Sequence, residues 1–257
     1  MPRTVRLDQL LHQRGFFPSR EKAKRAVMAG LVHVGGQRAD KPGTGFVPEA
    51  EIEVRGKGEP FVSRAGRKLA AALDRFELDP RGFTCLDVGA STGGFTDCLL
   101  QRGAARVYAL DVGYGQLDQG LRLDGRVVVM ERVNARHLEP DALPEKVDLI
   151  TFDVSFISLT KVVPPTLAFL KPGGYVLPMI KPQFEAGRRQ VGKGGIVRDP
   201  EVRRRVIDER AADLEALGLS PLGVFDSPVH GMEGNREAFA LFRGPESRGD
   251  APPETAP

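Results

Sequence analysis

The chain has 257 residues, of which 41% are hydrophobic and 28% charged, a balance typical of a globular protein with one ordinary domain and a small one. Its net charge of +3 is too small to indicate a nucleic-acid partner by itself. No apolar run approaches the roughly 18 residues of a membrane span, the N-terminus lacks the apolar core of a signal peptide, and two cysteines cannot build a disulfide framework, so we expect a cytoplasmic protein.

Two short helices are predicted near the N-terminus. Leucines on one face predict a helix over residues 5–14. A second helix is predicted over residues 19–30, with Ser19 as its N-cap and Gly30 at its end. The first turns of this second helix carry the cations Arg20, Lys22, Lys24 and Arg25. Because cations at a helix N-terminus oppose the macrodipole, we expect an anionic partner there, and a solvated basic face is the alternative.

Short strands follow over residues 31–34, 36–39 and 50–54, separated by glycine turns. The segments RLDQLL and SREKAKRAVMAGLVHVGG resemble the S-four-type RNA-binding module over residues of about 4–55. The resemblance implies two helices on a small sheet, with the basic helix contacting RNA phosphates by shape rather than sequence. The RNA-contacting residues that we expect are Arg20, Lys22, Lys24, Arg25 and Arg64.

The predicted elements divide the chain into a small α+β N-terminal domain over residues 1–56, a linker over 57–62 and a larger domain over 63–243, and the resemblance implies that the first of these binds RNA. Residues 244–257 are too poor in apolar side chains to fold, so we expect a disordered tail. Ser63 is the expected N-cap of the first helix of the larger domain.

Strand and helix patterns alternate through the larger domain. The predicted strands cover residues 85–89, 105–112, 126–132, 148–154 and 173–180, and the predicted helices cover 96–103, 158–170 and 199–218. This alternation predicts an α/β fold with a doubly wound, mostly parallel sheet. Two last strands, over 221–229 and 237–243, are close in sequence and are expected to be antiparallel.

The segment TCLDVGASTGGF, at residues 84–95, is a short apolar strand that runs into a glycine-rich turn and then a helix. Gly89, Gly93 and Gly94 would let the backbone turn sharply and approach a ligand closely. This arrangement is typical of a loop that holds a nucleotide cofactor.

Two cofactors fit such a loop. A dinucleotide fingerprint requires G-x-G-x-x-G, and Ser91 stands where its second glycine should be. Asp87, expected to point into the site, would repel a pyrophosphate and favour the cationic S-adenosylmethionine. Asp111 ends the next strand, at the spacing of an acid that meets ribose hydroxyls. We therefore expect S-adenosylmethionine; a nicotinamide cofactor and a purely structural turn are the alternatives.

Further charged residues are expected at the same edge of the sheet, because ligands of open α/β sheets bind beyond the carboxyl ends of the strands. Asp153, Lys181 and Glu237 should join Asp87 there, and Lys68 lies on the helix before the first strand. A lone aspartate at a strand end is often a capping residue, and a lone lysine is usually exposed. Lys181, however, directly follows an apolar run and precedes a proline that fixes the path of the chain, which favours a positioned amine.

The chain resembles the TlyA (hemolysin A) family in the order of its motifs. After the N-terminal module these are SRAGRKL, LDVGASTGGFTDCLL, DLITFDVSFISL, MIKPQFE, VGKGGIVRD and GNREAF. Members of this family are ribosomal RNA ribose methyltransferases whose catalytic domain is similar to FtsJ/RrmJ, a Rossmann-like class I methyltransferase. The resemblance implies a catalytic tetrad at Lys68, Asp153, Lys181 and Glu237. The cofactor-binding residues that it implies are Asp87, Gly89, Ser91, Thr92, Gly93, Gly94, Phe95, Asp111, Val112, Asn134 and Ala135.

Ribose methylation requires a weak nucleophile, the 2′-hydroxyl, to attack a sulfonium methyl in line, and correct positioning can contribute about 7–11 kcal/mol. In this interpretation Lys181 stabilises the alkoxide or takes the proton, and Asp153 orients its amine. Lys68 and Glu237 would hold the ribose and its neighbouring phosphate, with Glu237 also fixing Lys68. No metal is expected, and the four histidines are interpreted as structural.

Three other functions compete with this one. Base-amine methyltransferases often carry N-P-P-Y or D-P-P-Y in the segment that begins at Asp153. This chain has D-V-S-F there, and the absence of the motif favours a ribose target. The alternatives are a catalytically inactive RNA-binding ribosome-assembly factor, a small-molecule methyltransferase and a membrane-active hemolysin. The expected partners are ribosomal RNA and ribosomal subunits, with no membrane, and the default expectation is a monomer.

Overall fold

The computed structural model describes residues 4–17, 19–55, 60–231 and 234–246. By its internal contacts the chain divides into two compact units, residues 1–60 and 61–257. Residues 57–59 of the predicted linker and 247–257 of the predicted tail lie outside the described residues. The start of that tail is ordered, because Gly244 N donates to Gly174 O at 2.7 Å and Gly173 N donates to Pro245 O at 2.9 Å. The expectation of disorder is therefore wrong for residues 244–246.

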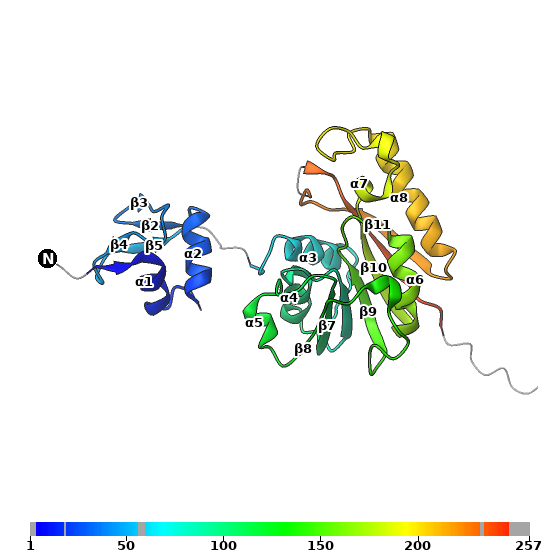
Figure 1. Ribbon diagram of the computed structural model, residues 1–257, viewed down its shortest axis with the longest axis horizontal. Coiled ribbons are helices and arrows are strands. Elements are labelled where there is room, and N and C mark those ends of the chain that lie inside the picture. The colour runs from blue at the N-terminus through cyan, green and yellow to red at the C-terminus, as the bar shows by residue number, and fades with distance from the viewer. Residues whose placement is uncertain (1–3, 18, 56–59, 232–233, 247–257) are drawn as a thin grey trace, which may run out of the picture. The chain divides into compact units, whose positions relative to one another are not determined.

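The N-terminal unit consists of two helices and short antiparallel strands (Figure 1). Its elements are β1 (Val5–Arg6), α1 (Leu7–Gln13), α2 (Arg20–Met28), β2 (Val32–Val34), β3 (Gln37–Arg38), β4 (Gly45–Phe46) and β5 (Ile52–Val54). Strands β3, β2 and β5 form one sheet in that order, and β1 pairs with β4. The helix predicted from residue 5 begins at Leu7, because Val5 and Arg6 pair with β4 instead.

The second predicted helix is confirmed in type and in its start. The Ser19 hydroxyl accepts a hydrogen bond from Lys22 N at 3.2 Å and caps α2. Gly30 follows the helix with a φ of 73°, a conformation that glycine adopts without strain. Apolar side chains of α1, α2 and β2, among them Leu11, Val27 and Val32, form the core of this unit.

The larger unit is built on a seven-stranded sheet with the order β11-β12-β10-β9-β6-β7-β8. Its strands are β6 (Thr84–Val88), β7 (Arg106–Asp111), β8 (Val127–Glu131), β9 (Val147–Phe152), β10 (Leu170–Ile180), β11 (Ser220–Asp226) and β12 (Ala238–Arg243). Strands β10, β9, β6, β7 and β8 are parallel, and β12 is antiparallel to β10 and β11. The predicted doubly wound α/β fold is confirmed.

Helices cover both faces of this sheet (Figure 1). On one face lie α3 (Ala65–Arg75) and α4 (Gly94–Gln101), and on the other lie α6 (Leu159–Thr166) and α8 (Pro200–Glu215). The shorter elements are α5 (Gln119–Arg122), α7 (Pro182–Glu185), η1 (Ala135–His137), η2 (Leu167–Phe169) and η3 (Arg188–Gln190). Since neighbouring side chains of a strand point to opposite faces, Cys85 packs toward α3 and α4 while Leu86 packs toward α6 and α8.

The starts of two helices in this unit can be compared with the sequence. The helix predicted from residue 199 is α8, and Asp199 caps it by accepting a hydrogen bond from Glu201 N at 2.8 Å. Ser63 does not cap α3, which begins at Ala65 after Arg64 and has no side-chain cap.

The strand order reverses at β6, which positions the candidate site. From β6 the chain first builds β7 and β8 on one side and then β9 and β10 on the other. In an open α/β sheet a ligand crevice lies outside the carboxyl ends of the strands at this reversal. Asp111 ends β7, Asp153 follows β9 and Lys181 follows β10, so all three lie at this edge.

Candidate active site

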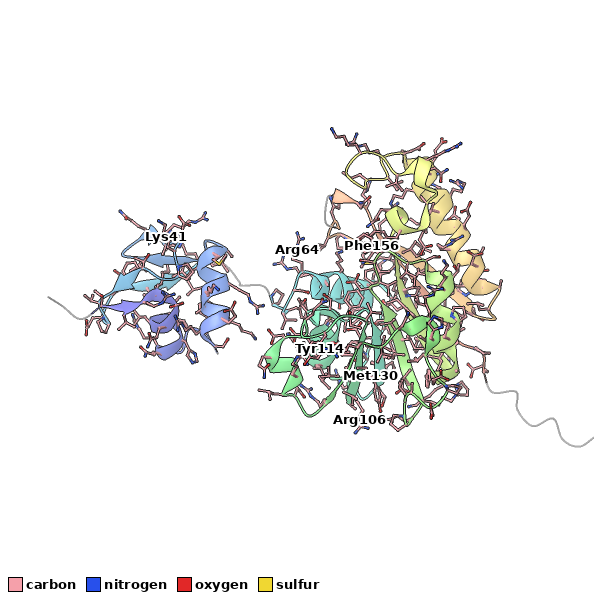
Figure 2. All side chains as sticks on the ribbon, viewed as in Figure 1. Lys41, Arg64, Arg106, Tyr114, Met130 and Phe156 are labelled. Carbon is pink, nitrogen blue, oxygen red and sulfur yellow. The ribbon has the colours of Figure 1, made fainter. Side chains whose placement is uncertain are left out.

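Two adjoining cavities open at this edge of the sheet. The larger, about 640 Å³, is lined by the four charged residues Lys68, Asp153, Lys181 and Glu237 and is called the tetrad cavity. The smaller, about 350 Å³, is called the Asp111 cavity. Both cavities are lined by Gly89, Ser91, Asp153, Ser155 and Phe156, which form a shared wall. Figure 2 shows Arg106, which starts β7, at the lower edge of this unit, and Phe156 and Arg64 well above it.

The Lys181 ammonium is held at this shared wall. Lys181 Nζ lies 2.6 Å from Asp153 Oδ1 and donates to Ser155 Oγ at 3.0 Å. Lys181 is only 8% exposed, and a buried ammonium needs such partners because desolvation of an unpaired charge is costly. The pair therefore presents a fixed amine where the two cavities meet.

A second ion pair lies across the tetrad cavity. Lys68 Nζ, from α3, binds Glu237 Oε2 at 2.5 Å. Glu237 directly precedes β12 and is 3% exposed. Gln183 Nε2, from α7, donates to the other oxygen, Glu237 Oε1, at 3.1 Å. All four predicted tetrad residues are thus brought together, as two ion pairs.

A close approach of two backbones makes the shared wall possible. Asp153 N donates to Val88 O at 3.0 Å, so the chain after β9 lies directly beside Gly89. Gly89 has a φ of 88°, and a Cβ there would lie 2.8 Å from Asp153 O. Only glycine fits this position, which supports the sequence-based interpretation of Gly89.

The Asp111 cavity combines one carboxylate with apolar side chains. Asp111 Oδ2 accepts from Ser91 N at 2.8 Å, and Oδ1 accepts from Gly113 N at 2.7 Å. Val112, Ala135 and Ile157 are among the apolar lining residues. The remaining lone pairs of Asp111 can accept ribose hydroxyls, and a flat base can pack on the apolar side chains. The cavity therefore fits an adenosine group such as that of S-adenosylmethionine.

The predicted cofactor residues divide between this cavity and the protein interior. The members that line the Asp111 cavity are Gly89, Ser91, Asp111, Val112, Asn134 and Ala135. The members that line neither cavity are Asp87, Thr92, Gly93, Gly94 and Phe95. Gln116 also lines the Asp111 cavity and bonds the Ser91 hydroxyl at 3.2 Å, although the sequence did not single it out.

Asp87 lies inside the protein rather than in the site. Its carboxylate is fully buried and accepts hydrogen bonds from Thr96 Oγ1 at 2.7 Å and Thr151 Oγ1 at 3.1 Å. Burial raises the pKa of Asp87 to about 7, and the opposing hydrogen bond from Thr96 offsets only part of this effect. The prediction that this carboxylate points into the site is wrong; it joins β6 to α4 and β9.

Two other glycines of the loop serve packing. A Cβ at Gly93 would lie 2.3 Å from Leu121 Cδ1, and a Cβ at Gly94 would lie 2.2 Å from Ser63 Oγ. Phe95 is 2% exposed and belongs to the core below α4. The protein itself therefore fills the space that the sequence interpretation reserved for a ligand.

An exposed aromatic side chain stands at the shared wall. Phe156 is 90% exposed, has a φ of 62° and lies 4.7 Å, centroid to centroid, from the ring of Phe184. Positive φ is strained for a phenylalanine, and such strain clusters at functional sites. The ring of Phe156 offers an uncovered apolar surface at the entrance of both cavities.

A loop over residues 192–197 forms the far rim of the tetrad cavity. Asn235, 3% exposed, accepts from Val197 N at 3.1 Å and donates to Gly195 O at 2.9 Å. Gly194 and Gly195 both line the cavity. These hydrogen bonds attach the loop to the segment that carries Glu237, so the loop has a defined position at the rim of the tetrad cavity.

The basic residues of α2 are partly engaged within the N-terminal unit. Arg20 Nε lies 3.2 Å from Asp8 Oδ2, and Lys24 Nζ lies 4.0 Å from Glu21 Oε2. The guanidinium of Arg6, followed by that of Arg20, lowers the pKa of the buried Asp8. The anion that Arg20 meets is therefore, in part, a carboxylate of the same chain. In the larger unit, Arg64 is exposed and lines the tetrad cavity.

Among the described residues, no three His, Cys, Asp or Glu side chains gather in a way that could hold a metal ion. In the same part of the chain, no helix is long and apolar enough to cross a membrane.

The fold and the paired cavities define a class I methyltransferase. The profile of the FtsJ-like methyltransferase family matches residues 61–244, and that of the S4 domain matches residues 5–52. The chain is 46% identical over 244 residues to the 16S/23S rRNA (cytidine-2′-O)-methyltransferase TlyA of Mycobacterium tuberculosis, which covers 95% of this chain and 91% of that one.

Two further relatives are similar along nearly their whole length. Hemolysin A of Brachyspira hyodysenteriae is 41% identical over 239 residues, covering 93% of this chain and 99% of the relative. A solved structure from Streptococcus thermophilus, of a protein given the name hemolysin, is 43% identical with a TM-score of 0.73, covering 96% of this chain and 91% of that one. The chain belongs to the TlyA (hemolysin A) family of FtsJ-like methyltransferases, and the resemblance seen in the sequence is confirmed.

Proposed function

We propose that this protein transfers a methyl group from S-adenosylmethionine to a ribose 2′-hydroxyl of ribosomal RNA. The observation that carries the proposal is the position of the Asp153–Lys181 pair, at the wall between a cavity that fits an adenosine group and a cavity lined by buried charges. The name of the Mycobacterium tuberculosis relative, an rRNA (cytidine-2′-O)-methyltransferase, supports the same reaction and substrate class.

The side chains have separate tasks in this reaction. When bound, S-adenosylmethionine supplies an electrophilic methyl group. Lys181 stabilises the developing alkoxide or accepts the hydroxyl proton, a contribution typically worth about 10²–10⁴-fold in rate. Asp153 orients the Lys181 amine across the 2.6 Å contact. Lys68, held by Glu237, is placed to bind the ribose or its phosphate.

Phe156 gives the target nucleotide a stacking surface. Its exposed ring stands at the entrance of both cavities, beside Phe184. A base stacked on an aromatic side chain gains about 1–3 kcal/mol without regard to base identity. Stacking there would leave the attached ribose free to enter the tetrad cavity.

The N-terminal unit supports a structured RNA as the substrate. Exposed cations on α2, with Lys22 and Lys24 among them, suit phosphate contacts, and this unit matches the S4 domain. We propose that the protein acts as a cytoplasmic monomer on ribosomal subunits. Because all four tetrad residues are present and paired, we favour an active enzyme over an inactive assembly factor.

Methyl transfer to ribosomal RNA can be measured with tritiated S-adenosylmethionine, purified ribosomal subunits and free ribosomal RNA. Label in RNA that survives alkaline hydrolysis as a resistant dinucleotide is expected, because a methylated 2′-oxygen cannot attack its own phosphate. Label recovered in a base, or no label despite measurable cofactor binding, would overturn the proposal.

A further inference from the structure

The side chain of Gln183 contacts one of the two ion pairs of the tetrad cavity, that of Lys68 with Glu237. It lies on α7, two residues after Lys181, and its Nε2 donates to Glu237 Oε1 at 3.1 Å. Lys68 Nζ binds the other carboxylate oxygen, Oε2, at 2.5 Å. Both oxygens of Glu237 are therefore engaged, one from α3 and one from α7.

The orientation of the Gln183 amide follows from its partner. An ionised carboxylate only accepts hydrogen bonds, so the amide nitrogen must face Glu237 and Oε1 must face away. Gln183 Oε1 is buried and has no hydrogen-bond partner among the described residues. An unsatisfied buried acceptor costs about 1–3 kcal/mol, so the contact with Glu237 is what holds the side chain in this orientation.

Within the part of the chain that the structure describes, the Glu237 carboxylate has little other support. A Cβ at Gly231 would lie 2.6 Å from Oε1, so the backbone closes this side of the carboxylate. Lys68 is the cation in contact with it. The other charged or titratable residues that line the same cavity are Arg64, Asp153, Lys181 and His230.

We propose that Gln183 is a positioning residue of the methyl-transfer site, which holds Glu237 in the rotamer that directs the Lys68 ammonium into the tetrad cavity. It acts through Glu237 and touches none of the reacting atoms. The kinetic consequence rests on the proposed function, because only a substrate in the tetrad cavity would sense where Lys68 points. Loss of this contact should lower the rate of methyl transfer while leaving cofactor affinity unchanged.

The isosteric variant Gln183→Glu tests this role. At high pH it places a second carboxylate against Glu237, and two adjacent carboxylates do not both ionise readily. At lower pH a protonated carboxyl at position 183 can donate to Glu237 as the amide does. Relative to wild type at the same pH, we expect at least about tenfold slower transfer near pH 8.5 and recovery toward wild type near pH 6, the tenfold figure corresponding to about 1.4 kcal/mol of lost positioning.

Two control variants separate this effect from others. Gln183→Ala removes the donor and should be impaired without the recovery at low pH. Gln119→Glu makes the same charge change at an exposed position on α5 and should follow wild type throughout. If Gln183→Glu also followed wild type at every pH, the positioning role would be refuted.

A carboxyl ¹³C NMR titration gives a second readout that needs no RNA. In Gln183→Glu, the two carboxyl groups should titrate as a coupled pair, with one proton retained to higher pH than for an ordinary glutamate. Independent titration of the two groups would refute the contact. If wild type methylated no RNA, the proposed function would fail, and this titration would still decide whether Gln183 holds Glu237.

Discussion

The two adjoining cavities are built from different chemistry. In the tetrad cavity, four charged side chains from α3, the ends of β9 and β10, and the start of β12 meet in two ion pairs. In the Asp111 cavity, one carboxylate is combined with apolar side chains such as Val112 and Ala135. The first arrangement suits the handling of charge and protons, and the second suits binding of a nucleoside. Substitutions in the two cavities should therefore separate the rate of methyl transfer from cofactor affinity.

The largest effect is expected at Lys181. Lys181→Ala removes the amine at the shared wall, so methyl transfer should fall by about 10²–10⁴-fold, as is typical when a general acid or base is lost. Cofactor affinity should stay within a few-fold of wild type, because the Asp111 cavity is untouched. Single-turnover assays and calorimetry measure the two quantities, with Lys161→Ala, an exposed lysine on α6, as the matched control. Normal turnover of Lys181→Ala would contradict its assigned role.

At Asp111 we expect the opposite result, a loss of cofactor affinity without a loss of methyl-transfer rate. Asp111→Asn removes a charged acceptor, and hydrogen bonds to charged groups contribute about 1.5–3 kcal/mol, so cofactor affinity should fall about 10–100-fold. Methyl transfer at saturating cofactor should remain near the wild-type rate. Calorimetry with S-adenosylhomocysteine measures the affinity, and an unchanged value would remove Asp111 from the cofactor site.

Phe156 lies where the cavities meet and should affect RNA more than cofactor. Loss of a stacking surface worth about 1–3 kcal/mol should raise the KM for RNA about 5–100-fold in Phe156→Ala. Phe156→Tyr keeps the ring and should retain most of the activity. Equal KM values for the two variants would show that the ring does not stack on the target base.

The buried carboxylate of Asp87 should make the stability of the protein depend on pH. Because the pKa of Asp87 is raised to about 7 in the folded state, the folded protein binds this proton more tightly than the unfolded chain. This contribution to stability is present at low pH and is lost as pH rises from about 4 to about 7. Asp87→Asn cannot ionise, so its melting temperature should fall less than that of wild type between pH 5 and pH 8. If the melting temperatures of the two proteins changed equally between pH 5 and pH 8, the raised pKa of Asp87 would be contradicted.

The smallest effects are expected on α2. Lys22→Ala and Arg20→Ala should each weaken RNA binding a few-fold and reduce its salt slope by about 1. Arg20→Ala should also lower the melting temperature, because Arg20 pairs with the buried Asp8. Filter binding over a salt series, with thermal melts, distinguishes the two roles. If the salt slope were unaltered in both variants, α2 would be a solvated basic face and not an RNA-binding one.

The glycine loop illustrates how far the sequence alone could lead. The pattern TCLDVGASTGGF correctly predicted β6, a turn and α4, because apolar runs and glycines constrain the local backbone. Which neighbours fill the space at Gly93 and Gly94 depends on α5 and on Ser63, and local sequence does not encode those contacts. The burial of Asp87 could not be predicted for the same reason.

The tetrad gives a similar lesson at longer range. Strand ends placed Asp153, Lys181 and Glu237 at one edge of the sheet, whereas the pairing of Lys68 with Glu237 followed only from the family resemblance. Gln183 was missed because a glutamine in a surface-like segment carries no signal of its own. Its position two residues after Lys181, on a short helix beginning at a proline, is the one clue that the sequence holds.

A crystal structure with bound S-adenosylhomocysteine tests the central claim most directly. We expect the adenosine in the Asp111 cavity, with its ribose hydroxyls on Asp111 and the sulfur at the shared wall beside Asp153, facing the Lys181 amine. An adenosine in the tetrad cavity, or a sulfur turned away from Lys181, would contradict the claim that methyl transfer takes place where the two cavities meet.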